Sequence, residues 1–441
     1  MHLNTLTQSL TISLALMLAG SMPMAADNLS QMESHFRNVP DSQPLAVYWY
    51  WMAGNISRDG VVKDLQAMKR AGINRAQIGI IGEGQGAPKG PVKTFSDAWW
   101  DVLHQALKTA GDLGIEIGIF NCPGWSQSGG PWVKAGQAMR YLAAECDTVS
   151  GPQTLTLTLR PHGEEQDVRV LAYPLKEGKA RLSCVGDLRT ATELVYTSSG
   201  PVTLRSVYIQ PAAHKGKLHV TLEVDRNGSY ESVKEFDIDR SNPALNVGFM
   251  PYAPVAVSLP ETRGQRFRVR LSKAGRVSQV VLSDVPRVER FAEKSLAKMW
   301  QTPHPMFDAY TWPSQPDYSA SMIVQPAEVK DLSGLVDTKG VLRWRVPQGR
   351  WVVERAMMRP TGTVNSPAPA DATGYETDKM SRTHIRAHFD AYLGEILRRI
   401  PPEDRKTFKI VVEDSYETGG QNWTDSLVAD FRRAYGYDPV P

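Results

Sequence analysis

The spacing of hydrophobic residues changes twice along this chain of 441 residues, and this change restricts the fold more than any other feature. In residues 40–147, short apolar runs alternate with segments whose apolar residues share one helical face, which is the pattern of strands that alternate with amphipathic helices. Residues 148–361 instead alternate apolar and polar residues, and residues 362–441 return to the first pattern. We therefore expect a parallel α/β unit that is interrupted by an insertion of antiparallel strands.

The first region predicts three buried strands and the helices between them. The strand candidates are short apolar runs at residues 47–51, 75–81 and 115–120. Ser57 and Ser96 can each cap a helix, and Gly72 and Gly114 follow the two amphipathic segments. Residues 135–145 predict a third helix. Strands joined by helices in this way favour a parallel sheet with right-handed crossovers.

The middle region predicts antiparallel strands. Its alternating runs lie at residues 155–159, 218–224, 267–271, 342–346 and 351–353. The sequence Asp225-Arg226-Asn227-Gly228, directly after one of these runs, is typical of a tight turn. Strands with one polar and one apolar face suit a sheet that is covered on one side only. We therefore expect residues 148–361 to form an inserted β-sandwich region of one or two modules.

The last region returns to the α/β pattern. Ser381 can cap a helix that stops before Pro401, and residues 408–412 form a strand candidate. Thr424 can cap a final helix that ends at Gly436. The first and last regions together supply about five strand–helix units, whereas a (β/α)8 barrel needs eight. The predicted fold class is therefore α/β, a partial (β/α)8 TIM-like barrel interrupted by an inserted antiparallel β-sandwich domain. An open doubly wound sheet is the alternative, but no Gly-x-Gly-x-x-Gly pattern follows the first strand.

The start of the chain and its cysteines bear on where the protein resides. Residues 6–25 are mostly apolar or small and carry no acidic or basic side chain, which predicts a signal peptide over residues 1–25 and a secreted or periplasmic protein. A membrane anchor is the alternative, but polar residues interrupt the run.

The chain has three cysteines, Cys122, Cys146 and Cys184, so at least one must be a free thiol. A Cys146–Cys184 bridge is compatible with an oxidising compartment.

The charge balance and the aromatic residues narrow the class of partner. Lys plus Arg number 50 and Asp plus Glu number 47, so the net charge of +3 is too small for a chain that binds nucleic acid through its overall field. The 11 Trp and 15 Tyr matter more, because several lie in loops beside Gly, Asn and acidic residues. Exposed aromatic rings next to carboxylates suit a sugar-binding site. We expect no nucleic-acid partner and, after removal of the signal peptide, no membrane association.

Two loops in the first region carry candidate sugar-binding residues, since ligands of parallel α/β folds bind at the carboxyl ends of the strands. At the end of the first strand, Trp51 offers an apolar face and Asn55 a donor and an acceptor, whereas the alternative is that Trp51 belongs to the core. The candidates in the loop after the third strand are Asn121, Trp125 and Trp132. A structural loop with buried Trp residues is the alternative there, and Cys122 has no evident paired His that would make it a nucleophile.

Two acidic segments in the last region complete the candidates. Glu376 and Asp378 precede a helix, where the helix dipole alone would favour an acid such as Asp378. The candidates after the last strand are Glu413, Asp414, Glu417, Asn422 and Trp423. A carboxylic acid in a partly apolar pocket has a raised pKa and can protonate a leaving oxygen, whereas the alternative is a set of solvated surface acids. Glycoside hydrolysis needs a second carboxylate, about 5–5.5 Å away for retention or about 6.5–9.5 Å away for inversion.

Taken together, these segments resemble the glycoside hydrolase family 106 α-L-rhamnosidases. The stretches that carry the resemblance are residues 47–55, 64–72, 90–93, 121–132, 374–380 and 414–424. The most specific of them is Asn121-Cys122-Pro123-Gly124-Trp125-Ser126 with Gly129-Gly130-Pro131-Trp132. The resemblance covers most of the two α/β regions and little of the middle region.

The resemblance implies a (β/α)8 catalytic domain with additional β-domains, and hydrolysis of terminal α-L-rhamnosides with inversion by two glutamates and a calcium ion. Glu417 matches the position of the general acid, with Glu413 as the reserve. The general base would fall beyond Pro441, so the chain is expected to be truncated, and no calcium ligand can be assigned. The partner implied is a rhamnose-containing oligosaccharide or glycoside. A secreted carbohydrate-binding or catalytically inactive truncated product is the alternative function.

Overall fold

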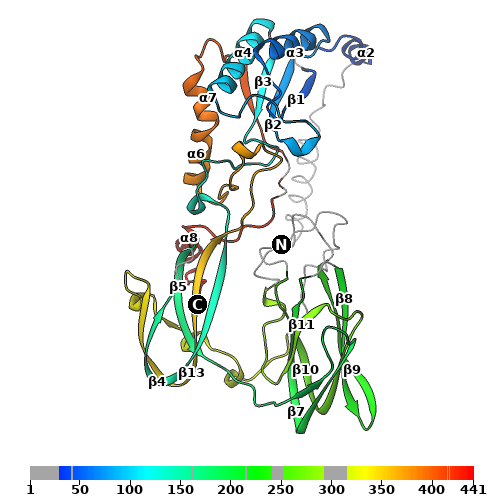
Figure 1. Ribbon diagram of the computed structural model, residues 1–441, viewed down its shortest axis with the longest axis vertical. Helices are drawn as coiled ribbons and strands as arrows, with labels where there is room; N and C mark the ends of the chain where they lie inside the picture. The colour runs from blue at the N-terminus through cyan, green and yellow to red at the C-terminus, as the bar shows by residue number, and fades with distance from the viewer. Residues whose placement is uncertain are drawn as a thin grey trace, which may run out of the picture.

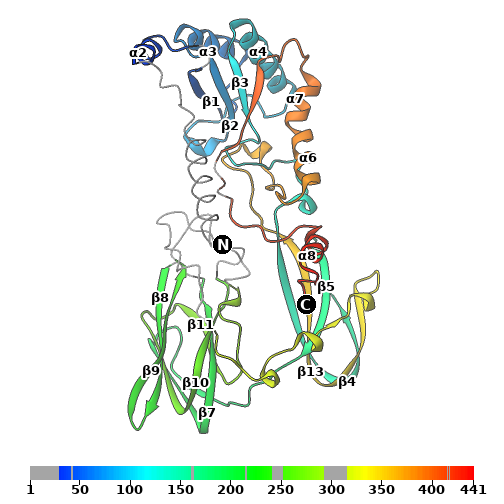
Figure 2. The same ribbon diagram turned by 180° about the vertical axis from the view of Figure 1, so that it is seen from behind.

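Within the described part of the chain, the strands form three β-sheets (Figure 1). The computed structural model describes residues 29–40, 43–159, 163–213, 216–240, 252–292, 315–414, 416 and 418–441. A parallel sheet and its helices occupy one end of the elongated molecule, and two antiparallel sheets lie side by side at the other end (Figure 2). The predicted signal peptide lies outside the described residues. None of the described helices has the length and hydropathy that a membrane span requires.

The parallel sheet is formed by strands from both α/β regions. Its order is β1 (Ala46–Met52), β2 (Arg75–Ile81), β3 (Glu116–Phe120) and β14 (Phe408–Val412), and each neighbouring pair is parallel. The helices of the described residues are α2 (Leu29–Arg37), α3 (Arg58–Arg70), α4 (Asp97–Leu113), α6 (Arg382–Ala391), α7 (Leu393–Arg399) and α8 (Leu427–Tyr435). The α/β architecture is confirmed, but the described strands form an open sheet, so the predicted barrel is not confirmed.

Local sequence signals set several helix ends as predicted. The hydroxyl oxygen of Ser57 accepts a hydrogen bond from the first turn of α3, and Ser96 and Ser381 cap α4 and α6 in the same way. Gly114 ends α4 with a φ of 66°, a left-handed conformation that glycine adopts without strain. These ends depend on residues within one turn of the helix, which is why the sequence alone located them.

The core of the α/β unit lies on one face of the parallel sheet. Trp49 and Trp51 of β1 are buried in it. They pack with side chains of β2, β3, α3, α4 and α7 that include Leu65, Ile78, Leu103, Leu107, Ile117 and Ile396. Because successive side chains of a strand point to opposite faces, Tyr48 and Tyr50 lie on the other face, where they are 57% and 36% exposed. One face of the sheet therefore carries the core and the other carries accessible aromatic rings.

Two antiparallel sheets lie between β3 and β14 in the sequence. The first has the order β12 (Lys330–Asp331), β5 (Gln166–Pro174), β13 (Val341–Pro360) and β4 (Arg140–Thr158). The second contains β6 (Ser183–Val185), β7 (Glu193–Pro211), β8 (Gly216–Arg226), β9 (Ser229–Arg240), β10 (Val255–Leu271) and β11 (Val277–Ser283). Each sheet has its own hydrophobic core. The predicted turn between β8 and β9 is present, with Asn227 and Gly228 at positive φ.

Two predictions for individual segments are wrong because distant residues decide them. Residues 135–145 do not form an α-helix, because only Ala135–Gln137 make a short 3-10 turn and from Arg140 onward the chain pairs along β13 as part of β4. Thr424 does not cap α8, which begins at Leu427. The hydroxyl of Thr424 instead donates to Asp378 Oδ2 at 2.7 Å.

The three cysteines carry free thiols. The Cys146–Cys184 bridge that the sequence left open is not formed, because Cys146 lies in β4 and Cys184 in β6, which belong to different sheets. Burial raises the pKa of the Cys122 thiol well above its ordinary value, so this thiol is poorly suited to act as a nucleophile.

Candidate active site

The loops that follow β3 and β14 meet at the carboxyl end of the parallel sheet. The backbone N–H of Asn121 donates to the carbonyl oxygen of Val412 at 2.9 Å. The Asn121 side chain donates from Nδ2 to the carbonyl oxygen of Gln127 at 2.7 Å and to Glu413 Oε1 at 3.3 Å. Asn121 therefore fixes its own loop and also orients a carboxylate on the neighbouring loop.

Aromatic side chains lie beside this contact. The ring centroids of Tyr50 and Trp125 are 5.8 Å apart, and Gln127 Nε2 donates to the carbonyl oxygen of Asp414 at 3.3 Å. Burial raises the pKa of Tyr50, and the nearby Tyr48 and Asp414 raise it further. We call this group of side chains the β3–β14 rim: Tyr50, Asn121, Trp125, Gln127, Glu413 and Asp414.

A buried histidine supports the rim from α6. Trp132 Nε1 donates to His388 Nδ1 at 3.0 Å, and His388 Nε2 donates to the carbonyl oxygen of Asn121 at 2.9 Å. These two partners require a neutral imidazole that carries its proton on Nε2. Burial lowers the pKa of His388 to about 4, so the ring stays neutral near pH 7. Trp132 also stacks on Tyr392 with ring centroids 5.5 Å apart, which makes it a structural residue here.

A buried acid lies next to the loop that follows β3. Glu376 is fully buried, and its Oε2 accepts hydrogen bonds from Ser128 Oγ at 2.8 Å and from Lys379 Nζ at 2.6 Å. Lys379 Nζ also lies 5.3 Å from the centre of the Tyr416 ring. Among the described residues, no group bonds to the second carboxylate oxygen of Glu376. Its charge is nevertheless matched by Lys379, as a buried carboxylate requires.

A second buried acid ties the loop after β14 to the insertion. Asp378 Oδ2 accepts hydrogen bonds from Arg140 at 3.0 Å and from Thr424 at 2.7 Å. Burial alone would raise the pKa of Asp378, but the hydrogen bonds from Thr424, Gln421 and Arg140 hold it below its ordinary value. Arg140 is itself fully buried and also contacts Asp425 at 2.7 Å. This network joins β4 to the segment that precedes α8.

The predicted residues Asn422 and Trp423 belong to the same junction. Asn422 Oδ1 accepts a hydrogen bond from the backbone N–H of Leu142 at 2.9 Å, and the backbone N–H of Trp423 donates to the carbonyl oxygen of Arg140 at 3.3 Å. Both contacts are with β4, and Trp423 is buried. We therefore assign these two side chains to the support of the loop rather than to the rim.

The remaining predicted residues lie apart from the rim or outside the described residues. Trp51 is only 3% exposed, and its ring centroid lies 6.1 Å from that of Trp99 in the core, so its prediction as a sugar platform is wrong. Asn55 is exposed but holds a turn, because its Nδ2 donates to the carbonyl oxygens of Pro88 and Met52. Glu417, the predicted general acid, lies outside the described residues.

The structure thus brings four of the predicted residues together, namely Asn121, Trp125, Glu413 and Asp414. The sequence analysis missed Tyr50, Gln127 and His388. Tyr and Trp alternate along β1, and successive side chains of a strand point to opposite faces of the sheet. A core position for Trp51 therefore predicts that Tyr50 lies on the opposite face. No comparable signal marked His388, whose partners are far away in the sequence.

The described residues identify no ligands for the calcium ion that the family resemblance implies. Within them, no group of three or more His, Cys, Asp or Glu side chains is placed to hold a metal ion. The two buried carboxylates, Glu376 and Asp378, are already bonded to Lys379 and Arg140. We therefore assign no calcium ligand and derive no chemical step through calcium.

Comparisons with known proteins bear on the family and the fold of this chain. The chain matches the family model of glycoside hydrolase family 106, described as α-L-rhamnosidase, over residues 37–441. The solved structure of a rhamnosidase from Novosphingobium sp. PP1Y is 26% identical in sequence, with a TM-score of 0.73 over 92% of this chain and 42% of that one. A curated protein of Formosa agariphila named "Putative beta-glucuronidase" is 26% identical over 417 residues, which are 93% of this chain and 26% of that protein.

This chain therefore spans less than half the length of either relative. The family match nevertheless covers both α/β regions and the whole insertion, and the solved rhamnosidase shares the fold. The chain belongs to glycoside hydrolase family 106, the α-L-rhamnosidase family.

Proposed function

We propose that this chain is part of an exo-acting glycoside hydrolase that removes terminal α-L-rhamnosyl residues with inversion. The observation that carries the proposal is the hydrogen bond from Asn121 to Glu413, because it joins two loops at the carboxyl ends of parallel strands. Enzymes built on parallel α/β barrels place their catalytic groups at that end. Membership of the family supports a glycoside as the substrate.

The β3–β14 rim offers the groups that a pyranose needs. The rings of Tyr50 and Trp125 provide flat surfaces for the C–H face of a sugar. Gln127 and Asp414 lie beside them with polar groups that suit sugar hydroxyls. The rhamnosyl ring would therefore rest on the aromatic side chains with its hydroxyls toward the two loops.

The chemistry that we propose uses two carboxyl groups. A carboxylic acid donates its proton to the glycosidic oxygen as the bond from that oxygen to the anomeric carbon breaks. A carboxylate about 6.5–9.5 Å away takes a proton from the water that attacks the opposite face of that carbon. We assign the acid to Glu417, with Glu413 as the reserve, and the base to a residue outside this chain. The family resemblance supports the choice of Glu417, and the contact with Asn121 supports Glu413.

The assignment of the acid is tested in the full-length protein with Glu417→Gln. A general acid contributes about 10²–10⁴-fold to the rate of a reaction. The rate of hydrolysis of an alkyl α-L-rhamnoside should therefore fall by that factor. Activity on 4-nitrophenyl α-L-rhamnoside, whose leaving group needs no proton, should change little. Glu403→Gln, which alters an exposed acid outside the rim, is the control.

Two outcomes would contradict this assignment. An equal loss on both substrates, or no loss on either, would remove the acid role from Glu417. If Glu413→Gln instead gives the selective loss, the acid is the reserve residue.

The substrate is tested in the same assay with 4-nitrophenyl β-D-glucuronide, because one relative carries the name of a glucuronidase. We expect turnover of the rhamnoside only, and preferential turnover of the glucuronide would overturn the rhamnose assignment. The family match does not favour the alternative of a carbohydrate-binding or inactive product, which predicts binding of rhamnosides by the full-length protein without turnover.

Calcium dependence and secretion complete the proposal. The expectation of calcium dependence comes from the family resemblance of the sequence. The expectation of secretion comes from residues 1–25. We expect a chelator to abolish activity and calcium to restore it. We expect N-terminal sequencing of the exported protein to show that the first residues have been removed.

A further inference from the structure

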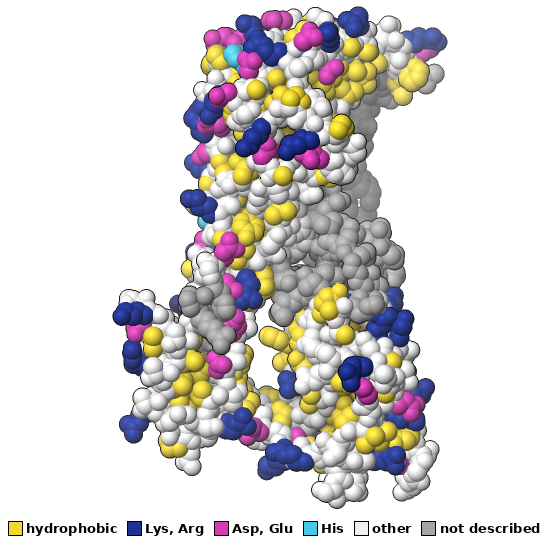
Figure 3. Space-filling model, viewed as in Figure 1, with side chains coloured by type: hydrophobic (Ala, Val, Ile, Leu, Met, Phe, Trp, Pro, Cys, Tyr) yellow, Lys and Arg dark blue, Asp and Glu magenta, His cyan; other side chains and the backbone are white. Residues whose placement is uncertain are grey.

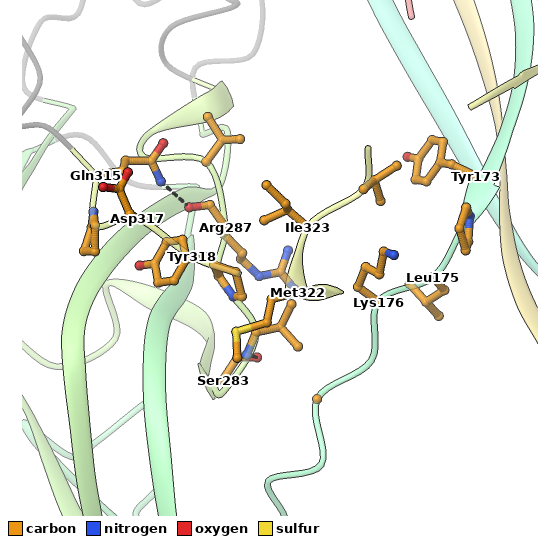
Figure 4. A pocket seen from close by; sticks show the side chains of 17 residues that line it. Tyr173, Leu175, Lys176, Ser283, Arg287, Gln315, Asp317, Tyr318, Met322 and Ile323 are labelled. Carbon is orange, nitrogen blue, oxygen red and sulfur yellow. Dashed lines mark hydrogen bonds between the residues drawn. The ribbon is translucent and has the colours of Figure 1, made fainter. Parts of the chain in front are cut away.

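A pocket of about 770 Å³ lies between the two antiparallel sheets, and no residue of the β3–β14 rim lines it (Figure 4). One wall is the end of β5 and the residues after it, with Tyr173 and Lys176. The other wall is the end of β11 and residues 315–318, with Arg287 and Tyr318. The volume falls within the range of about 300–1,000 Å³ that small-molecule sites occupy.

The walls expose apolar side chains to this space. Val288 and Ile323 line the pocket and are 53% and 41% exposed, so apolar surface faces this space. Figure 3 shows hydrophobic side chains on both sides of the gap between the two sheets. The half-buried rings of Tyr173 and Tyr318 add flat surfaces with polar edges. A ligand with apolar faces and polar edges would match these walls.

The charges in the pocket favour a ligand with a negative group. Arg287 points toward the middle of the pocket, and within the described residues its guanidinium makes only a cation–π contact, 5.1 Å from the centre of the Tyr208 ring (Figure 4). Its hydrogen-bond donors therefore remain for a ligand, and a guanidinium fork fits a carboxylate. Lys176 on the opposite wall is already neutralised by Glu328 at 2.8 Å.

The polar groups beside Arg287 favour a ligand that also carries hydroxyls. Gln315 Nε2 donates to Ser258 Oγ and to the carbonyl oxygen of Arg287, each at 2.8 Å, which leaves the amide oxygen of Gln315 as an acceptor. Asp317 is exposed on the same wall and can accept further hydrogen bonds. This acid would repel a ligand with several negative charges, such as a polyphosphate. One carboxylate among many hydroxyls fits better.

We propose that this pocket binds an oligosaccharide that carries a carboxylate, at a site separate from the catalytic one. Arg287 binds the carboxylate, Gln315 and Asp317 bind hydroxyls, and Tyr318 and Ile323 contact the apolar face of a sugar ring. The site would hold an acidic glycan near the enzyme whether or not the rim cleaves rhamnosides.

The test is calorimetric titration of the protein with trigalacturonate and with the neutral trisaccharide galactotriose at low ionic strength. We expect trigalacturonate to bind with a Kd of about 1 mM or lower and galactotriose about tenfold more weakly. Arg287→Gln should weaken binding of trigalacturonate about tenfold, and Arg287→Lys should weaken it less. Arg266→Gln, which changes an exposed arginine of β10 outside the pocket, should have no effect.

Several results would overturn the proposal. They are the absence of binding at about 10 mM trigalacturonate, equal affinity for both trisaccharides, and unchanged affinity in Arg287→Gln. Loss of binding in Glu413→Gln but not in Arg287→Gln would place the ligand at the β3–β14 rim instead. Because Arg287 is exposed, its variants should fold, and Tyr318→Leu offers a second variant that should weaken binding by removing the aromatic ring.

Discussion

The acids near the candidate active site fall into two groups that differ in burial. Glu376 and Asp378 are fully buried, and each is bonded to a cation from another part of the structure or the same loop. Glu413 is exposed and Asp414 half-buried, and the described partner of the Glu413 carboxylate is a neutral amide. The buried acids therefore hold loops in place, whereas the exposed Glu413 is accessible to a ligand.

The largest effect on stability should come from breaking the buried ion pair between Asp378 and Arg140. Asp378→Ala removes the buried one of the two carboxylates that pair with Arg140, which should lower the free energy of unfolding by about 3–5 kcal/mol. Asp101→Ala is the control, because its ion pair with Arg58 is exposed and such pairs contribute about 0–1 kcal/mol. Urea denaturation measures both. Equal losses would show that burial does not distinguish the two pairs.

A smaller effect should appear as a pH dependence of stability. The folded-state pKa of His388 is lowered from 6.5 to about 4, so between these values the unfolded state binds a proton that the folded state does not. The contribution of His388 is present above about pH 6.5 and is lost as the pH falls toward 4, by about 3 kcal/mol in total. His388→Gln should reduce this slope in urea denaturation across that range. An unchanged slope would show that His388 is not held neutral.

The smallest effect on stability should come from the rim. Glu413→Gln keeps the size of an exposed side chain, so the free energy of unfolding should change by about 0.5 kcal/mol or less. The same variant should lower kcat/KM for the rhamnoside in the full-length protein, because it removes a charge that Asn121 orients. A loss of stability as large as that of Asp378→Ala would show that Glu413 supports the structure as the buried acids do. It would contradict the difference between buried acids and rim acids.

The sequence predicted those parts of the fold that depend on neighbouring residues. The four parallel strands, the caps at Ser57 and Ser96 and the turn at Asn227 follow from spacing and side-chain chemistry within a few positions. The sequence also placed candidate residues after β3 and after β14, and the structure shows that these two strands are parallel neighbours.

The remaining features depend on partners that are distant in the sequence. Residues 140–145 resemble a helix locally, but β13, about two hundred residues later, supplies strand hydrogen bonds for them. Thr424 has the chemistry of a helix cap, but it bonds to the buried Asp378. Trp51 and Tyr50 are neighbours with similar side chains, and only the position of the helices decides which of them faces the core.

The most direct measurement of where the sugar binds is a crystal structure of the full-length protein with L-rhamnose. We expect the sugar at the β3–β14 rim, with its ring over Tyr50 or Trp125 and its oxygens within hydrogen-bond distance of Asn121 and Glu417. Rhamnose bound elsewhere, or Glu417 directed into bulk solvent far from Asn121, would contradict the proposed active site.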